Sequence, residues 1–108
     1  MEVELRSRVM AVLTSKQRQF LRGLAHPLAP IVRIGKGGVT PSVVEETKKS
    51  LHSHELIKVR IDVDDGAQRR EVANRLAGET GSQLAGTVGK IAILYRERDE
   101  EPEIKLPL

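Results

Sequence analysis

The sequence predicts one α/β (α+β) domain of two layers, in which helices cover a mixed four-stranded sheet. Apolar residues switch between the helical and the strand period along the chain, in the order αβαβαββ. The 108 residues, 39% of them hydrophobic, are enough for one core, and no repeat or linker divides them. A strand-helix-strand unit makes its two strands parallel, whereas the final hairpin is antiparallel, so we expect a mixed sheet.

The first predicted helix begins at Thr14, whose side chain can cap it, and it ends before Pro27 and Pro30. Its apolar residues recur with the 3.6-residue period and are expected on the buried face: Phe20, Leu21, Leu24 and Ala25. The β-branched run 31–34 predicts a short strand. That strand ends at the three glycines within residues 35–38.

The second predicted helix has Thr40 as its N-cap and Pro41 at its first position, and it runs to about Ser53. Residues 56–63 predict the clearest strand, because side chains of two kinds alternate along it. One face is expected in the core and carries Ile57, Val59, Ile61 and Val63. The other face is expected to meet solvent and carries Leu56, Lys58, Arg60 and Asp62.

The last predicted elements are a helix over residues 67–80 and a β-hairpin. Asp65 or its neighbours can cap that helix, and Gly81 is suited to close it. The hairpin strands, 83–88 and 91–96, are joined by Gly89-Lys90, with glycine first as a type II′ turn prefers.

These elements set the expected boundaries of the domain. We expect residues 14–96 to form it, residues 1–13 to be an N-terminal extension, and residues 97–108 to be a charged tail. The tail is expected to be mobile unless its apolar residues dock onto the domain: Ile104, Leu106 and Leu108.

The charge of the chain is distributed unevenly. Residues 14–96 contain 14 Lys and Arg against 8 Asp and Glu, a net +6, whereas residues 97–108 contain 2 against 5, a net −3. No acidic residue occurs between Thr14 and Val44. Such one-sided charge favours a polyanion as partner, although a solvated basic face remains the alternative.

Composition also excludes several classes of protein. Cysteine is absent, which excludes disulfides, thiolate metal sites and cysteine nucleophiles, and is compatible with a cytoplasmic location. No apolar run approaches the roughly 20 residues that a membrane span needs, so no membrane association is expected.

The glycine-rich turn is the strongest functional motif in the sequence. Gly35-Lys36-Gly37-Gly38 stands between a predicted strand and a predicted helix. Glycines remove side chains where a phosphate backbone approaches, and the turn's amides and the helix N-terminus can face it. A plain tight turn is the alternative.

Neither the P-loop nor the dinucleotide fingerprint fits these residues. Stacking on aromatic side chains is also disfavoured, because Phe20 is expected to be buried and Tyr95 is the one other aromatic. Backbone clamping, as in KH domains, remains.

With these motifs the chain resembles the CRM domain (chloroplast RNA splicing and ribosome maturation), in its bacterial stand-alone, YhbY-like form. The matching blocks are residues 14–18, 21–26, 34–40, 55–59, 89–90, 94–96 and 104–107. The resemblance implies a fold similar to the C-terminal domain of translation initiation factor three. It also implies RNA binding through the glycine turn and association with precursors of the large ribosomal subunit, with ribosomal RNA and ribosomal proteins as partners.

The interpretation we favour is a non-catalytic RNA-binding protein without a cofactor. Its predicted RNA-binding residues are Gly35, Lys36, Gly37, Gly38, Thr40, Arg18, Arg22, Arg33, Lys58 and Arg60. Two alternatives remain open, namely a double-stranded DNA-binding protein of similar fold and a protein-interaction module on ribosomal particles. A metal enzyme using His52, His54 and Glu55 is disfavoured, because two histidines near a helix end lack a third ligand in fixed register.

Overall fold

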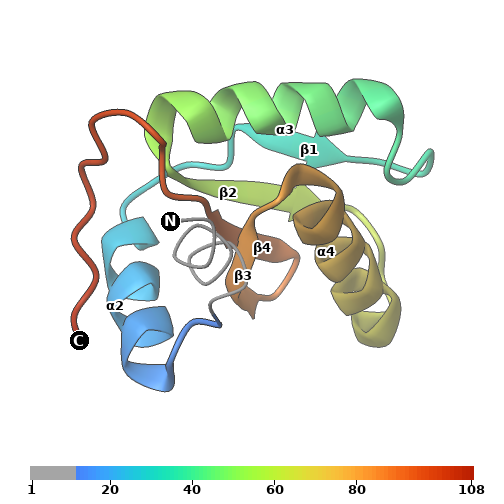
Figure 1. Cartoon of the computed structure of the whole chain (residues 1–108). Helices are drawn as coiled ribbons and strands as arrows, with labels where there is room; N and C mark the ends of the chain where they lie inside the picture. Colours follow the sequence, from blue (N-terminus) through green and yellow to red (C-terminus); the bar gives the residue numbers. More distant parts are fainter. Residues whose placement is uncertain (1–11) are drawn as a thin grey trace.

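The sheet and its three helices are seen in a computed structural model, which describes residues 12–108 (Figure 1). Residues 1–11, most of the expected N-terminal extension, lie outside the described part. The elements in chain order are α2 (Ser15–Ala25), β1 (Val32–Ile34), α3 (Pro41–His54), β2 (Leu56–Ile61), α4 (Gly66–Thr80), β3 (Gln83–Val88) and β4 (Ile91–Tyr95). The predicted order αβαβαββ is therefore confirmed for these residues.

The four strands form a mixed sheet in the order β1-β2-β4-β3. β1 pairs with β2 in parallel, and β4 pairs antiparallel with both β2 and β3. The parallel pair follows from the crossover through α3, and the hairpin supplies the antiparallel pair. Gly89 has a φ of 58°, as the first position of a type II′ turn requires. The predicted α+β class and mixed sheet are confirmed.

The caps of the helices agree with the local signals in the sequence. The Thr14 hydroxyl accepts a hydrogen bond from the Gln17 N–H at 3.1 Å, and the Gln17 side chain accepts one from the Thr14 N–H at 3.0 Å. This reciprocal pair is a capping box. Asp65 caps α4 by accepting from the Gln68 N–H, and Gly81 ends α4 with a φ of 68°.

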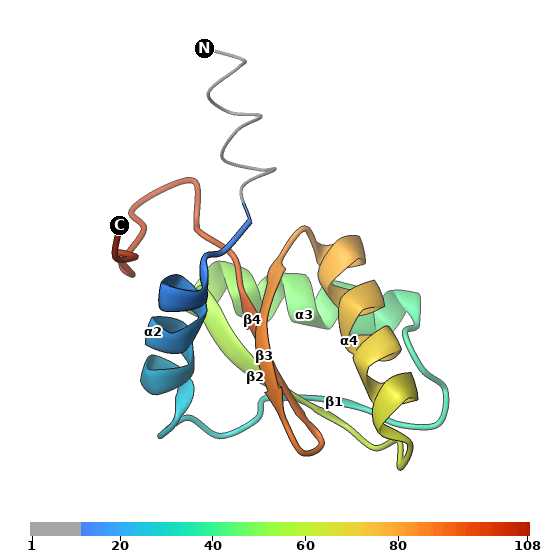
Figure 2. The same ribbon diagram turned by 90° about the horizontal axis from the view of Figure 1, so that it is seen from below.

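Helices cover both faces of the sheet, with α3 and α4 on one face and α2 on the other (Figure 2). Each face has its own apolar cluster. The cluster under α3 and α4 contains Val32, Ile34, Val44, Leu51, Ile57, Val59, Ile61, Ala73, Leu76, Ala77, Ala92 and Leu94. The cluster under α2 contains Leu13, Leu21, Ala25, Leu56, Ala85, Ile93 and Tyr95.

This arrangement corrects two expectations. The second face of β2 is solvent-facing only toward its end, because Leu56 is buried under α2, which adds a third layer to the two that the sequence predicts. Phe20 was expected to be buried, but it is 39% exposed, and Leu24 is similarly exposed. α2 meets the sheet through Leu21 and Ala25, one turn apart, so each preceding residue is rotated by about 100° toward solvent.

The C-terminal tail is held against the domain. The Glu55 carboxylate accepts hydrogen bonds from the backbone N–H groups of Arg98, Glu103 and Ile104 at 2.8–3.0 Å. Ile104 and Leu106 pack against the cluster under α2, whereas Leu108 is fully exposed. Of the two states considered for the tail, the docked one is observed, through two of the three apolar residues expected.

No helix in residues 12–108 is both long enough and apolar enough to span a bilayer.

Candidate nucleic-acid interface

The corner between β1 and α3, residues 35–40, is built around a tight turn. β1 ends at Ile34, and the Gly38 N–H donates to the Gly35 carbonyl at 3.1 Å. Gly38 has a φ of 71°, in the left-handed region that favours glycine. Gly35, Lys36 and Gly37 are exposed. The glycine at position 38 is therefore explained by the fold of the corner itself.

The other two glycines of the corner are not explained by the packing of the protein. A Cβ atom added to Gly35 would meet no atom within 4 Å, and one added to Gly37 would meet only the Thr40 Cγ2 at 3.8 Å. Neither residue has a φ in the left-handed region. Glycine in a fixed conformation has an entropic cost that alanine avoids, so a fold-only explanation would favour a side chain at both positions. The open space at these residues lies on the outside of the corner.

Thr40 and Pro41 begin α3 and orient its N-terminus. The Thr40 hydroxyl accepts from the Val43 N–H at 3.2 Å, and its carbonyl accepts from the Val44 N–H at 3.0 Å. The first turn of α3 contains no acidic residue. The positive end of the helix therefore adds to the charge of Lys36 at the corner. Thr40 has a structural role as cap, and its contact with RNA stays a prediction.

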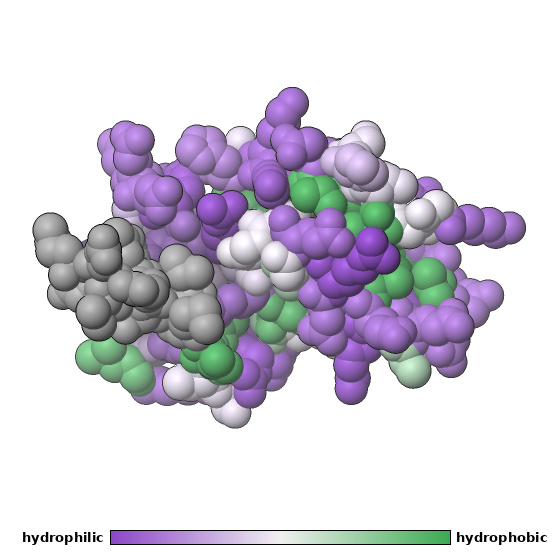
Figure 3. All heavy atoms as spheres, turned by 45° about the vertical axis from the view of Figure 1, so that its right-hand side comes forward, coloured by the Kyte–Doolittle hydropathy of each residue, from purple (hydrophilic) through white to green (hydrophobic). Residues whose placement is uncertain are grey.

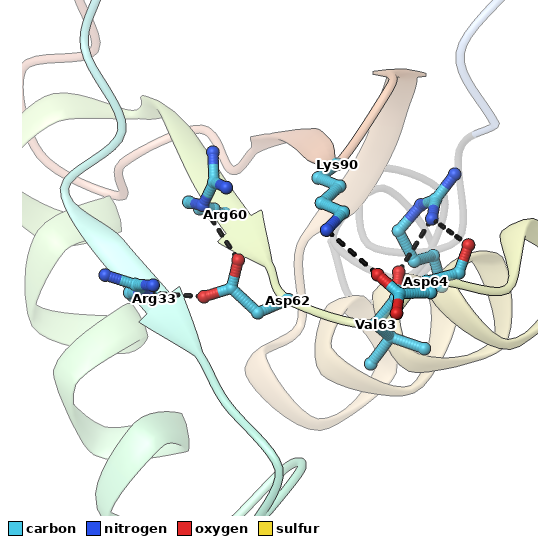
Figure 4. Close-up of polar contacts among 7 residues, drawn as sticks. Arg33, Arg60, Asp62, Val63, Asp64 and Lys90 are labelled. Atoms are coloured by element: carbon cyan, nitrogen blue, oxygen red, sulfur yellow. Dashed lines mark hydrogen bonds and ion pairs between the residues drawn. The ribbon is translucent and has the colours of Figure 1, made fainter.

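Arg33 and Arg60 lie side by side on the open part of the sheet, as Cα partners on β1 and β2. One carboxylate joins them: Arg33 Nε donates to Asp62 Oδ2, and Arg60 Nε donates to Asp62 Oδ1 at 2.8 Å (Figure 4). The hydrogen bond from Arg33 lowers the pKa of Asp62, and the one from Arg60 lowers it further. The carboxylate is therefore ionised at neutral pH. The sequence places Asp62 on the face of Arg60, but its contact with Arg33 depends on strand pairing.

The remaining predicted cations lie on α2 or contact its C-terminal end. Lys58 Nζ donates to the His26 carbonyl at 3.0 Å, and Arg22 Nη1 donates to the Ala85 carbonyl at 3.3 Å. Arg22 lies so close to Gly86 that a Cβ there would come within 2.8 Å of the Arg22 Cδ. Arg18 Nη1 donates to the Leu13 carbonyl at 2.7 Å, at the start of α2.

The predicted residues thus fall into two groups. The corner residues, with Arg33 and Arg60 beside them, form one end of the molecule, whereas α2, which carries Arg18 and Arg22, lies at the other end (Figure 1). Lys58 lies between the two groups, two residues before Arg60 on β2. Contact of all ten residues with one ligand would require that ligand to extend along the sheet face.

The corner is not covered by the acidic tail. The tail runs beside α2 and the C-terminal end of α3, while the corner lies at the N-terminal end of α3 (Figure 1). With the corner side turned forward, the surface is mostly hydrophilic, and hydrophobic residues show only in small separated areas (Figure 3).

Glu55, the carboxylate of the disfavoured metal cluster, is occupied by other contacts. Both oxygens of Glu55 accept backbone hydrogen bonds from the tail, and the side chain is fully buried. His52 and His54 are exposed at the end of α3. Among residues 12–108, no group of three or more His, Cys, Asp or Glu side chains is arranged to hold a metal ion.

Within residues 12–108, a mixed four-stranded sheet, three helices and a glycine corner between β1 and α3 define a small α+β domain with an exposed basic turn. Residues 13–96 match the model of the CRS1 / YhbY (CRM) domain, and the chain belongs to this family. The resemblance found in the sequence is confirmed.

Relatives of known name are similar over nearly the whole chain. An "RNA-binding protein" of Haemophilus influenzae is 42% identical over 98 residues, which are 91% of this chain and 98% of the relative. "Probable RNA-binding protein YqeI" of Bacillus subtilis is 40% identical over 96 residues, covering 89% of this chain and 100% of the relative. The solution structure of the hypothetical protein SAV1595 from Staphylococcus aureus superposes with a TM-score of 0.80 at 38% identity, covering 89% of this chain and 100% of that one.

Proposed function

We propose that this protein binds RNA without catalysis, and that the corner of residues 35–40 clamps the sugar-phosphate backbone. The observation that carries the proposal is the pair of exposed glycines, Gly35 and Gly37, whose missing side chains leave space outside the protein. A backbone that approaches there can accept hydrogen bonds from main-chain N–H groups. The names of two relatives as RNA-binding proteins support RNA as the ligand.

The other residues of the interface supply charge around this clamp. Lys36 is exposed on the corner, and the N-terminus of α3 adds the partial positive charge of the helix dipole there. Contacts to phosphates position a nucleic acid and carry no base information. Selectivity for particular RNAs then comes from single-stranded or distorted regions whose backbone can enter the corner.

The physiological ligand that we propose is ribosomal RNA within precursors of the large ribosomal subunit, with ribosomal proteins as neighbours in the cytoplasm. The family resemblance is the basis of this step. Crosslinking in cells, followed by sequencing of the attached RNA, tests it directly. Enrichment of large-subunit ribosomal RNA is the expected result, and a distribution over unrelated transcripts would contradict it.

Lys36→Glu is expected to weaken RNA binding by about tenfold, equally for oligonucleotides of different sequence, because a repelled phosphate contact is common to all of them. If the wild type neutralises about four phosphates of single-stranded RNA, its log-log salt slope is about −3, and the variant's is shallower. Fluorescence anisotropy at several salt concentrations measures both quantities. Lys105→Glu, with the same charge change on the tail away from the corner, is the matched control. Equal losses in the two variants would remove the corner from the interface.

Two rival functions are separated by binding experiments. Competition of duplex DNA against structured ribosomal RNA is expected to favour the RNA, and preference for the duplex would indicate a DNA-binding protein. A protein-interaction module would co-sediment with ribosomal particles even after ribonuclease treatment, whereas the proposed clamp would be released by it.

A further inference from the structure

Arg33, Arg60 and Asp62 form a hydrogen-bonded cluster on the sheet face. The two arginines are Cα partners on adjacent strands, and one carboxylate accepts from the Nε of each (Figure 4). Their Nη groups make no hydrogen bond with residues 12–108. The side chains of Arg33 and Arg60 are 73% and 46% exposed.

This use of Nε leaves the terminal edge of each guanidinium available. That edge presents two parallel N–H donors, and its geometry matches two oxygens of a phosphate. Adjacent strands lie about 4.8 Å apart, so the two side chains start from neighbouring positions on β1 and β2. Two arginines against one aspartate leave a net charge of +1 for an anion to meet.

The place of the cluster connects it with the corner. Arg33 precedes Gly35 by two residues, and Asp62 donates its backbone N–H to the Ile34 carbonyl at 2.9 Å, next to the end of β1. α2 ends at Ala25, and Lys58 on β2 donates to the carbonyl of the next residue, His26. Arg33 and Arg60 are exposed, so residues 12–108 leave the sheet face beyond Lys58 open toward the corner.

We propose that Arg33 and Arg60, held by Asp62, form a second phosphate-binding site for the RNA strand that leaves the corner. The ligand class is a phosphodiester of single-stranded RNA. Asp62 is a positioning residue, which fixes two long side chains before binding and so reduces the entropy that they lose on contact. The inference rests on the proposed RNA binding and adds to it the path of the strand across β1 and β2.

The direction in which RNA affinity changes when the Asp62 charge is removed tests the role of Asp62. If Asp62 acted only as a negative charge on a basic surface, its removal would raise the affinity for RNA. If it positions the arginines, Asp62→Asn lowers the affinity by about fivefold despite the gain of one positive charge. Asp64→Asn is the matched control, because Asp64 pairs with Lys90 at 3.1 Å and its side chain is 99% exposed. That variant is expected to bind as well as the wild type or better.

A second pair of variants separates the effect of the paired N–H donors of the two arginines from the effect of their positive charge. Arg33→Lys with Arg60→Lys keeps both charges but removes the paired donors, and it is expected to weaken binding. In that background Asp62 has no arginine to position, so Asp62→Asn only removes a negative charge and is expected to raise the affinity for RNA. The measurement is anisotropy titration of a labelled single-stranded RNA at two salt concentrations, with thermal melts to show that every variant is folded.

Three outcomes are distinguished by this design. Weaker binding by Asp62→Asn, reversed in the lysine background, supports the site. Unchanged or tighter binding by Asp62→Asn, while the wild type binds RNA and Lys36→Glu binds it more weakly, overturns the site and leaves the corner intact. A wild type that binds no RNA overturns both the site and the proposed function.

Discussion

Replacing Glu55 by glutamine is expected to lower the free energy of unfolding by about 2–3 kcal/mol, since hydrogen bonds to charged groups are the strong ones. The carboxylate is fully buried and accepts from three backbone N–H groups of the tail. Glutamine keeps one acceptor oxygen but turns an NH2 group toward a backbone donor. The midpoint of thermal unfolding is expected to fall by about 8–20 °C.

The pH dependence of stability identifies the charge of Glu55 as the cause. Burial raises the pKa of Glu55, but the backbone hydrogen bonds from Arg98, Glu103 and Ile104 and the charge of Arg98 outweigh it, so the pKa is lowered on balance. A lowered pKa means that the stabilisation is present above the unfolded value, about 4.3, and is lost as the pH falls through the folded value. Urea unfolding is therefore expected to show a gap between wild type and Glu55→Gln at pH 7 that narrows below about pH 4. A gap that is constant with pH would contradict this explanation.

The backbone of Glu55 offers a further comparison. Its φ is 64° and its ψ is −36°, a region that residues other than glycine rarely adopt. Glu55→Gly removes the carboxylate together with the strain, whereas Glu55→Ala removes the carboxylate alone. The glycine variant is expected to be more stable than the alanine variant by about 1 kcal/mol, and both less stable than the wild type. The carboxylate is thus expected to outweigh the strain that its position imposes.

The parts of the fold that the sequence predicts depend on short-range signals. Thr14, Thr40 and Asp65 each cap a helix within three residues, and Gly81 ends one by its own φ. Strand β2 follows from an alternation that is visible in a few residues. The crossover rule then gives the parallel pair, because the connection through α3 leaves no other common arrangement.

The parts that the sequence does not predict depend on residues far apart in the chain. Glu55 reads as a weak metal ligand beside two histidines, but its donors lie 43 to 49 residues later, in the tail. The burial of Leu56 depends on α2 crossing to the second face of the sheet. At the candidate site, the glycine turn and Arg60 can be read from the chain, whereas the bridge from Asp62 to Arg33 requires the register of β1 against β2.

Placing alanine at both Gly35 and Gly37 is expected to leave the domain as stable as the wild type or slightly more stable. The added Cβ meets no atom within 4 Å at position 35 and makes only an ordinary contact with the Thr40 Cγ2, at 3.8 Å, at position 37; neither position has a left-handed φ. RNA affinity is expected to fall by about thirtyfold, if each methyl group displaces one backbone hydrogen bond worth about 1 kcal/mol. Calorimetry of RNA binding, with a thermal melt of the same sample, measures both effects.

Gly38→Ala is expected to show the opposite pattern, a loss of stability. Its φ of 71° makes any side chain strained, so this variant is expected to lose about 1 kcal/mol of stability. The alanine pair at 35 and 37 separates binding from folding, since neither methyl group clashes with the protein, whereas both face a molecule that approaches from outside. Retained RNA affinity in the alanine pair would show that no backbone enters the corner, and the glycines would then need an explanation other than contact with a ligand.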